Sequence, residues 1–445
     1  MSNSLRIEQA LEVATQTKAL VLGEDVIDRA GELFKSQFPG RRAIVISTRM
    51  HYKLLGQEIE LSFQHAGIQY DEPFLFDSLS LSAEFPFVES LDSLLLRTRA
   101  IPVALGAGTI NDLTKLSAYR TGKRYMCIAT AASMDGYAAY GASITFRGEK
   151  RDFECAAPKA ILADTKVIAR APSTLTASGY ADLFAKITAG ADWILADALG
   201  IEPINEFCWS IIQNGLKEAL ADPKGVREGN VESIGKLTEG LLLGGFAMQG
   251  LRNSRPASGA EHQFSHLWDM ERHTFEGAAP SHGFKVSIGM LAVTALYEQM
   301  LATDLSQLDI ERAVALWPDA EDAASEVRDL FADNDFISIA VSETMVKHIS
   351  KEDLGVQLLM LKNMWPQIAE RLRAQLVPFD EVVRSLELVG APTRPSQIGI
   401  SRDHLRESYR RAAHIRRRFT VLDVALRTGM LEEWLDQIFG PDGIW

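Results

Sequence analysis

Histidine is concentrated in one short stretch of this 445-residue chain. Four of its nine histidines lie between Ser258 and Gly283. They are His262, His266, His273 and His282. Neutral imidazole is the commonest metal ligand among protein side chains, and it also carries protons near neutral pH. The clustering therefore favours a metal site, although ordinary histidines of helices and loops would leave the same pattern.

The spacing of these histidines separates their expected roles. His262 and His266 are four residues apart, which places both on one face of a helix. Either both bind a metal, or one binds it and the other carries a proton. His282 follows a loop, whereas His273 lies in a charged stretch and is expected to face solvent.

Two histidines need a further ligand to complete a metal site, and Asp182 is the candidate. It lies in G-Y-A-D-L-F-A-K, a helical pattern that is otherwise largely apolar. A carboxylate on an apolar helix needs a partner. That partner is either a metal or Lys186, which follows four residues later on the same face.

A glycine loop, G-A-G-T-I-N-D at 106–112, follows a predicted strand and opens a helix. Gly106 and Gly108 permit a tight turn, and a helix N-terminus beside glycines suits a diphosphate. Thr109 and Asp112 are expected at the N-cap and N3 positions of a capping box. No third glycine completes the dinucleotide fingerprint, so a plain strand–turn–helix corner fits equally well.

A second loop, T-A-A-S-M-D-G-Y, follows the next predicted strand. Thr130 and Ser133 could donate hydrogen bonds to a cofactor, and Asp135 could accept one from a substrate hydroxyl. Serine, aspartate and glycine are also common in ordinary turns, which is the favoured interpretation from chemistry alone.

The elements that position these residues change character near residue 170. Before it, short β-branched runs alternate with helical patterns, which predicts βαβ units and a parallel sheet. Strands are expected at 42–48, 101–105 and 125–130, with a helix at 50–67. Residues 143–155 predict a β-hairpin with Gly148 in its turn, and 160–169 predict more extended chain.

Beyond Pro172, a good helix start, a period of 3.6 residues dominates. Examples are 174–198, 240–252 and 404–418. We therefore predict an α/β nucleotide-binding domain at 1–170 and an all-α domain at 171–445 that binds metal and substrate. Four arginines recur on the helix expected near the C-terminus, namely Arg402, Arg406, Arg410 and Arg418. They could bind a substrate phosphate, but a basic helix face exposed to solvent is the favoured interpretation.

Composition narrows the function classes. The net charge of −13 argues against non-specific binding to nucleic acid or anionic membranes. The three cysteines, Cys127, Cys155 and Cys208, are widely spaced, so neither a disulfide framework nor a thiolate zinc site is expected. The N-terminus has no signal-peptide pattern and no run is long enough to span a membrane, so we expect a cytoplasmic protein.

Taken in order, five motifs resemble the superfamily of metal-dependent glycerol dehydrogenases and dehydroquinate synthases. They are G-A-G-T-I-N-D, T-A-A-S-M-D-G-Y, G-Y-A-D-L-F-A-K, E-H-Q-F-S-H and S-H-G. Within that superfamily the sequence is most similar to the bacterial sn-glycerol-1-phosphate dehydrogenase branch, over about residues 100–430. The resemblance implies a dehydroquinate synthase-like fold.

The resemblance also implies roles for individual residues. Asp182, His262 and His282 match the metal ligands, and the metal is zinc, nickel or iron depending on the member. The residues that match cofactor contacts are Gly106, Gly108, Thr109, Ile110, Asn111, Asp112, Thr130 and Ser133. Asp135 and His266 match substrate-side groups, and Asp182 is implied to contact the substrate as well.

The implied reaction is NAD- or NADP-linked interconversion of dihydroxyacetone phosphate and sn-glycerol 1-phosphate. Two departures from the family lie on the cofactor side: Thr48 and Arg49 replace an acid after the strand at 42–48, and Ala138 and Ala139 replace a serine. Because a guanidinium favours a 2′-phosphate, we expect NADP to be accepted at least as well as NAD.

Three other functions stay open from the sequence. They are a dehydrogenase for glycerol or another polyol, a dehydroquinate synthase, and a non-catalytic nucleotide- or metal-binding relative. The sequence also leaves open whether the chain forms a homo-oligomer.

Overall fold

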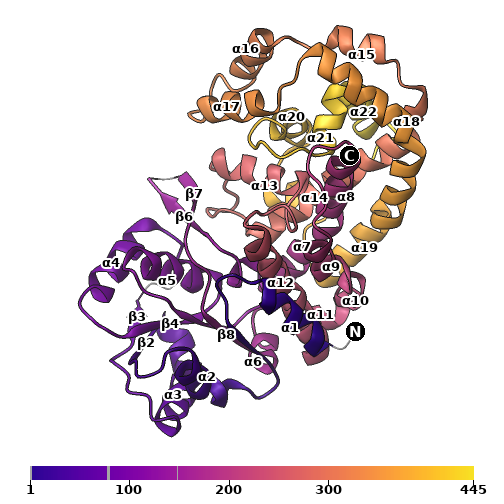
Figure 1. Ribbon diagram of the computed structural model, residues 1–445. Coiled ribbons are helices and arrows are strands. Elements are labelled where there is room, and N and C mark those ends of the chain that lie inside the picture. Colours follow the sequence, from indigo (N-terminus) through magenta and orange to yellow (C-terminus); the bar gives the residue numbers. More distant parts are fainter. Residues whose placement is uncertain (1–2, 78–80, 148) are drawn as a thin grey trace. The chain divides into compact units, whose positions relative to one another are not determined.

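A computed structural model describes residues 3–77, 81–147 and 149–445 (Figure 1). The chain forms two compact units. The sheet unit comprises Met1–Phe184, Phe207–Ser254 and Leu388–Gly390, and the helical unit comprises Ala185–Glu206, Arg255–Glu387 and Ala391–Trp445. Secondary structure changes near residue 170 as expected, since the last strand ends at Asp164. The two compact units are defined by packing and divide the chain at other places. The predicted boundary at 170 between a nucleotide-binding domain and a metal-binding domain stays a prediction.

The sheet unit is built on six parallel strands in the spatial order β1-β8-β5-β4-β2-β3. Their bounds are β1 (Ala19–Gly23), β2 (Ala43–Thr48), β3 (Phe74–Phe76), β4 (Ile101–Gly106), β5 (Met126–Ala129) and β8 (Ala160–Asp164). The inner strands β4, β5 and β8 are buried at every position. Strands buried on both faces read as continuous apolar runs, which is why the sequence predicted the inner strands β2, β4 and β5.

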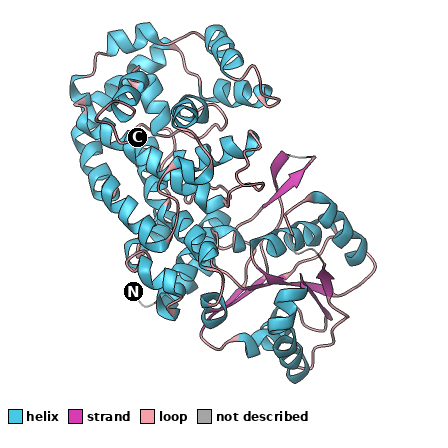
Figure 2. Cartoon of the chain, turned by 180° about the vertical axis from the view of Figure 1, so that it is seen from behind, coloured by secondary structure: helices cyan, strands magenta, loops and turns pink. Residues whose placement is uncertain are grey.

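Helices lie on both faces of this sheet (Figure 2). Those that follow the first strands are α2 (Ala30–Gln37), α3 (Arg49–His65), α4 (Phe85–Leu95) and α5 (Gly108–Arg120). The remaining helices of the unit are α1 (Asn3–Val13), α6 (Thr165–Ala169), α7 (Ser173–Phe184), α9 (Glu206–Gln213), α10 (Leu216–Ala219), α11 (Pro223–Glu228) and α12 (Val231–Leu251). One core joins Phe34 of α2 and Phe63 of α3 to strand residues such as Val103 and Ile128.

The order of the strands creates a switch point between β2 and β4. The chain runs from β2 outward to β3, then returns to β4 and proceeds through β5 to β8 in the opposite direction. In open parallel sheets, ligands bind outside the carboxyl ends of the strands at such a point. The loops that follow β2 and β4 therefore occupy the expected nucleotide position within this unit.

Two local predictions in this unit have mixed outcomes. The hairpin is confirmed as β6 (Ala142–Phe146) paired antiparallel with β7 (Glu149–Phe153), whereas Gly148 lies outside the described residues. The prediction of extended chain over 160–169 is wrong for residues 165–169, which form the helix α6. The carboxylate of Asp164 accepts hydrogen bonds from the backbone of Lys166 and Val167 and so starts α6.

The helical unit is arranged around α14 (His282–Ala302), most of which is buried. Its other helices are α8 (Lys186–Ala198), α13 (Ala260–Met270), α15 (Ile310–Leu316), α16 (Ala320–Leu330), α17 (Ile337–Lys347), α18 (Lys351–Gln375), α19 (Phe379–Val389), α20 (Arg402–Ala412), α21 (Val421–Arg427) and α22 (Leu431–Ile438). The helix expected over 404–418 is too long, because α20 ends at Ala412. Arg418 therefore does not share a helix with Arg402, Arg406 and Arg410.

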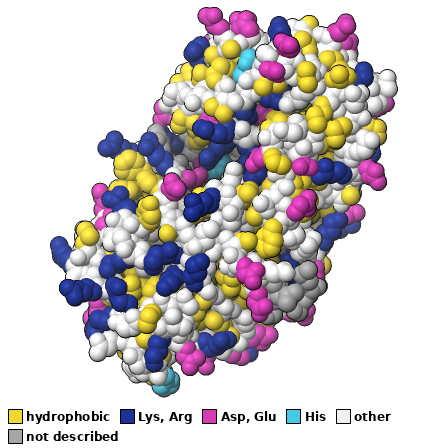
Figure 3. Space-filling model, in the orientation of Figure 1, with side chains coloured by type: hydrophobic (Ala, Val, Ile, Leu, Met, Phe, Trp, Pro, Cys, Tyr) yellow, Lys and Arg dark blue, Asp and Glu magenta, His cyan; other side chains and the backbone are white. Residues whose placement is uncertain are grey.

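Charged side chains of both signs are spread over the face of the molecule drawn in Figure 3. On the face in Figure 3, basic and acidic side chains are interspersed with uncharged ones, so the net negative charge forms no continuous acidic area there. Within the described part of the chain, no helix is both long and apolar enough to cross a membrane.

Candidate metal and nucleotide sites

The three predicted metal ligands lie close enough together to hold one cation. One ligand atom from each of Asp182, His262 and His282 lies within 4.8 Å of the other two. Asp182 is buried near the end of α7, His262 is in the first turn of α13, and His282 is the first residue of α14. One carboxylate and two imidazoles match the donor set of catalytic zinc sites with an open position, and they also suit nickel or iron.

Backbone and side-chain contacts orient this donor set. Oδ2 of Asp182 accepts the backbone N–H of Asp135 at 2.9 Å. Ser281 caps α14 by accepting the N–H of Phe284 at 3.4 Å, which fixes the start of the helix where His282 lies. The residues present therefore fit a metal ion and are held before it binds.

Glu261 is a functional candidate that sequence reasoning missed. Its carboxylate is completely buried, and Oε1 lies 2.7 Å from Nδ1 of His262. It also accepts the N–H of Gly259 at 2.6 Å and the hydroxyl of Thr188 at 3.0 Å. Burial raises the pKa of Glu261, but the hydrogen bonds from His262 and the backbone outweigh it and hold the pKa below its usual value.

The contact with Glu261 determines which nitrogen of His262 is available to a metal. An ionised carboxylate only accepts hydrogen bonds, so Nδ1 carries the proton and Nε2 keeps its lone pair for a metal. The sequence offered no signal for this pair, since neighbouring residues of a helix point in different directions. The two side chains meet in the first turn of α13, whose N-cap is Gly259.

Asp192 of α8 fastens the elements around α13. Its Oδ2 accepts the N–H of Ala260 at 2.7 Å, and its Oδ1 accepts the N–H of Val421 at 2.8 Å and the hydroxyl of Tyr297 at 2.6 Å. Burial, with the charge of Glu261 nearby, raises the pKa of Asp192 to about 7. One buried carboxylate thus ties the starts of α13 and α21 to α14.

His266 and His273 differ in their surroundings. The ring of His266 lies 6.4 Å from that of His262, while the rings of His262 and His282 are 5.2 Å apart. Burial, followed by the charge of Arg416, lowers the pKa of His266 well below its usual value, so the imidazole is neutral at pH 7. The expectation that His273 faces solvent is wrong: it is half-buried, with Nε2 2.6 Å from the carbonyl oxygen of Ile398.

The glycine loop joins β4 to α5 as expected, but the predicted capping box is wrong. Helix α5 begins at Gly108 with Ala107 as its N-cap, and no side chain caps it. Thr109 and Asp112 therefore lie inside the helix. The first N–H groups of a helix have no intrahelical acceptor, so those of Gly108, Thr109 and Ile110 suit an anion such as a diphosphate.

The side chains of Asn111 and Asp112 are buried in contacts that support the neighbouring loop. Asn111 accepts the hydroxyl of Tyr125 at 2.9 Å, and Asp112 lies 3.5 Å from the ammonium of Lys115. Lys115 was not predicted. It is buried and donates to three carbonyl oxygens, that of Gly136 in the second loop at 2.8 Å and those of Ala139 at 3.1 Å and Gly141 at 2.9 Å just after the loop. Direct contact of Asn111 and Asp112 with a cofactor stays a prediction.

The second loop carries the other predicted cofactor and substrate residues. The hydroxyl of Thr130 is buried and has no hydrogen-bond partner among residues 3–77, 81–147 and 149–445. A buried hydroxyl without a partner is costly, so this atom fits a group supplied by a cofactor. Ser133 lies 3.3 Å from the hydroxyl of Tyr137, and Asp135 begins the short helix η2 (Asp135–Tyr137).

The position at the end of β2 that is predicted to select the coenzyme contains an ion pair that the sequence did not reveal. Thr48 caps α3 by accepting the N–H of His51 at 3.2 Å. The exposed guanidinium of Arg49 pairs with Asp77, which follows the adjacent strand β3. A carboxylate is thus present beside the predicted ribose position, although it comes from a different strand.

A parallel sheet with a switch point, a helix start that suits an anion and an Asp-His-His set that could hold a cation are the features of this fold and its candidate sites. A sequence profile described as iron-containing alcohol dehydrogenase matches residues 21–172. The chain belongs to the iron-containing alcohol dehydrogenase family. This confirms the resemblance stated from the motifs.

Individual relatives and structures agree with this assignment. A protein of Halalkalibacterium halodurans named glycerol-1-phosphate dehydrogenase (NAD(P)+) is 32% identical over 256 residues, which cover 57% of this chain and 64% of that protein. This chain therefore spans less than two thirds of that relative. A Pyrococcus horikoshii protein of the same name is 30% identical over 284 residues, covering 63% of this chain and 78% of that protein.

The crystal structure of a probable glycerol dehydrogenase from Sinorhizobium meliloti 1021 superimposes with a TM-score of 0.58. It has 16% identity and covers 94% of this chain and 97% of that one. At this identity the likeness concerns the fold, and it confirms the predicted α/β sheet followed by a largely helical region.

Proposed function

We propose that this chain is a metal-dependent NAD(P)-linked dehydrogenase that interconverts dihydroxyacetone phosphate and sn-glycerol 1-phosphate. The observation that carries the proposal is the proximity of Asp182, His262 and His282 within a chain of this family. The names of the relatives from Halalkalibacterium halodurans and Pyrococcus horikoshii support the choice of substrate.

The residues divide the work between metal and substrate. A divalent cation, when bound, polarises the substrate carbonyl, and a nicotinamide coenzyme supplies the hydride. Asp182, His262 and His282 hold the cation, and Asp182 also contacts the substrate. His266, one helical turn beyond His262, exchanges a proton with the substrate oxygen, directly or through water. Asp135 accepts a hydrogen bond from a substrate hydroxyl.

The coenzyme is held by the sheet unit. The first N–H groups of α5 bind its diphosphate, and Thr130 and Ser133 donate to it. Arg49 favours the 2′-phosphate of NADP, while the carboxylate of Asp77 beside it tempers that preference. We therefore expect both coenzymes to be accepted, with NADP at least as good as NAD.

The test is oxidation of NADH and NADPH by metal-loaded protein with dihydroxyacetone phosphate or unphosphorylated dihydroxyacetone, before and after chelation. We expect turnover with the phosphorylated ketose that is lost on chelation and restored by metal. Turnover with dihydroxyacetone alone would identify a polyol dehydrogenase. Bound metal without net coenzyme oxidation on either ketose would refute the proposal and point to a dehydroquinate synthase or a non-catalytic relative.

A further inference from the structure

Three donors converge on the completely buried carboxylate of Asp192 in α8. Its Oδ2 accepts the N–H of Ala260, the first residue of α13, and its Oδ1 accepts the N–H of Val421, the first residue of α21. Oδ1 also accepts the hydroxyl of Tyr297 in α14. Because the first N–H groups of a helix have no acceptor within the helix, Asp192 supplies one to two helices at once.

Gly259 leaves room for this carboxylate at the start of α13. It is the N-cap residue of the helix and has no side chain that could cap it. A Cβ atom at this position would lie 2.5 Å from Oδ2 of Asp192, which is closer than side-chain atoms pack. A serine or aspartate that caps its own helix therefore does not fit here. The cap comes instead from α8, 68 residues away in the sequence.

The capped turn carries the proposed metal ligand His262. In this turn, Glu261 accepts the N–H of Gly259 at 2.6 Å, and its carboxylate lies 2.7 Å from Nδ1 of His262. Ala260, whose N–H lies 2.7 Å from Asp192, is the residue between Gly259 and Glu261. Asp192 therefore holds the backbone of the turn, and Glu261 orients the imidazole that the turn carries.

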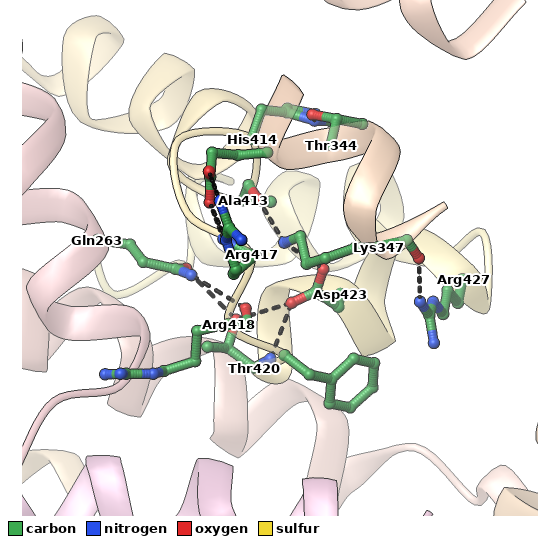
Figure 4. A network of polar contacts seen from close by, with 12 residues as sticks. Gln263, Thr344, Lys347, Ala413, His414, Arg417, Arg418, Thr420, Asp423 and Arg427 are labelled. Atoms are coloured by element: carbon green, nitrogen blue, oxygen red, sulfur yellow. Dashed lines mark hydrogen bonds and ion pairs between the residues drawn. The ribbon is translucent and has the colours of Figure 1, made fainter. Parts of the chain in front are cut away.

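A second set of contacts joins α13 to the start of α21 (Figure 4). The side-chain oxygen of Gln263 in α13 lies 3.4 Å from the hydroxyl of Thr420, the N-cap of α21. Asp423 accepts the N–H of Thr420 at 2.8 Å and the ammonium of Lys347 in α17 at 2.6 Å. These contacts do not involve Asp192, so we expect α21 to keep a cap and a link to α13 when Asp192 is replaced.

The arrangement of donors explains why a carboxylate is needed at position 192. A carboxylate has two acceptor oxygens, one for each helix start. Asparagine has nearly the same shape but a single acceptor oxygen, and its NH₂ group only donates. That NH₂ group would face the N–H of Ala260 or of Val421, and two donors cannot form a hydrogen bond. Replacing Asp192 by asparagine would therefore release one of the two helix starts without changing the volume of the core.

We propose that Asp192 is a positioning residue for the metal centre, because it holds His262 in place by fastening the first turn of α13 to the first turn of α21. The inference rests on the proposed function, in which Asp182, His262 and His282 bind the metal. Asp192 acts through the backbone of Ala260 and needs no contact with the ion. Without this cap, the turn that carries His262 can shift relative to α14, so metal affinity falls although every ligand atom is still present.

The test compares Asp192→Asn with Asp423→Asn, two identical changes at the start of α21. Both aspartates are buried and accept an N–H there, but Asp192 also caps α13, whereas Asp423 pairs with Lys347 of α17. Competition between the full-length protein and a chelator gives the affinity for Zn²⁺. It should fall about tenfold to a hundredfold in Asp192→Asn, the range for residues that orient metal ligands. It should stay close to the wild-type value in Asp423→Asn, although both variants should unfold at a lower temperature than wild type.

Two further measurements separate positioning from a loss of stability. The visible absorption of bound Co²⁺ reports its coordination geometry, so it should change in Asp192→Asn and match wild type in Asp423→Asn. Tyr297→Phe removes one donor from Asp192 and keeps both helix caps, so Zn²⁺ affinity should fall only about threefold. If Asp192→Asn does not fold, Tyr297→Phe becomes the decisive variant, and an unchanged Zn²⁺ affinity in it would overturn the proposal.

The readout does not depend on turnover, which separates this inference from the proposed function. If wild type binds Zn²⁺ without reducing dihydroxyacetone phosphate, and affinity falls in Asp192→Asn but not in Asp423→Asn, the proposed function fails and the inference stands. If wild type reduces dihydroxyacetone phosphate and Asp192→Asn binds Zn²⁺ as tightly as wild type, the inference fails and the proposed function stands. Equal losses of affinity in the two asparagine variants would also overturn the role of Asp192.

Discussion

The nucleotide loops and the start of α13 hold their functional groups in opposite ways. In the glycine loop, the useful donors are backbone N–H groups, and their geometry follows from a few adjacent residues that end β4 and begin α5. At the start of α13, the useful atoms are side chains that are oriented by buried carboxylates, Glu261 and the distant Asp192. The loop is defined locally, whereas the helix start also depends on Asp192, which lies far away in the sequence.

This difference predicts where substitutions act most strongly. A side chain in the loops adds one contact to a backbone frame that persists without it. Under the proposed function, a metal-ligating side chain at the start of α13 or α14 is part of an interdependent set, so its loss should affect the metal and every group that the metal aligns. We therefore expect the largest effects at the proposed metal ligands and the smallest in the loops.

The largest effect is expected for His282→Ala. Removing one of the three proposed ligands should abolish stoichiometric metal binding and lower turnover about a thousandfold or more, since several kcal/mol of transition-state stabilisation would depend on the ion. Metal content by mass spectrometry and coenzyme oxidation would be measured together. His273→Ala is the matched control, because this histidine of the same stretch contacts the carbonyl of Ile398 instead. Retained metal and activity in His282→Ala would remove it from the ligand set.

A smaller effect is expected for Glu261→Gln. The amide keeps the size of the side chain and an oxygen that can accept the N–H of His262, but it removes the negative charge that makes the imidazole a stronger donor to a metal. Metal affinity should fall about tenfold to a hundredfold, as for other partners of ligating histidines. Competition with a chelator measures this without reference to turnover. Glu276→Gln, at an exposed position of the same stretch, should leave the affinity unchanged.

The same contrast explains how much could be predicted from the sequence. Buried strands β2, β4 and β5 were identified because apolar runs are local signals. The three metal ligands were named because their motifs resemble a family and occur in the right order. The glycine loop was placed correctly, yet its cap was not: Thr109 has a residue type suited to an N-cap, but the helix had already begun at Gly108.

Contacts between distant segments could not be predicted. Asp77 meets Arg49 because β3 pairs with β2, and Lys115 meets the second loop because α5 lies beside it. Glu261 illustrates the strongest limit. It is adjacent in sequence to His262, and helical periodicity gives no signal for contact between neighbours, yet the carboxylate and the imidazole lie 2.7 Å apart in the first turn of α13. The helix expected over 404–418 was too long, because α20 stops at Ala412 although the helical sequence pattern continues.

The smallest effect is expected for Thr130→Val, which tests the loop side of the comparison. Valine keeps the shape of threonine and removes the buried hydroxyl, so a lost cofactor hydrogen bond should raise the KM for NADPH about threefold to tenfold, with metal content unchanged. Thr114→Val is the control, since the hydroxyl of Thr114 in α5 is also buried and without a partner among the described residues. If a bound cofactor satisfies Thr130 alone, Thr114→Val leaves the KM as it is. Equal KM values in wild type and Thr130→Val would mean that the backbone frame binds the cofactor unaided, which would sharpen the contrast with α13.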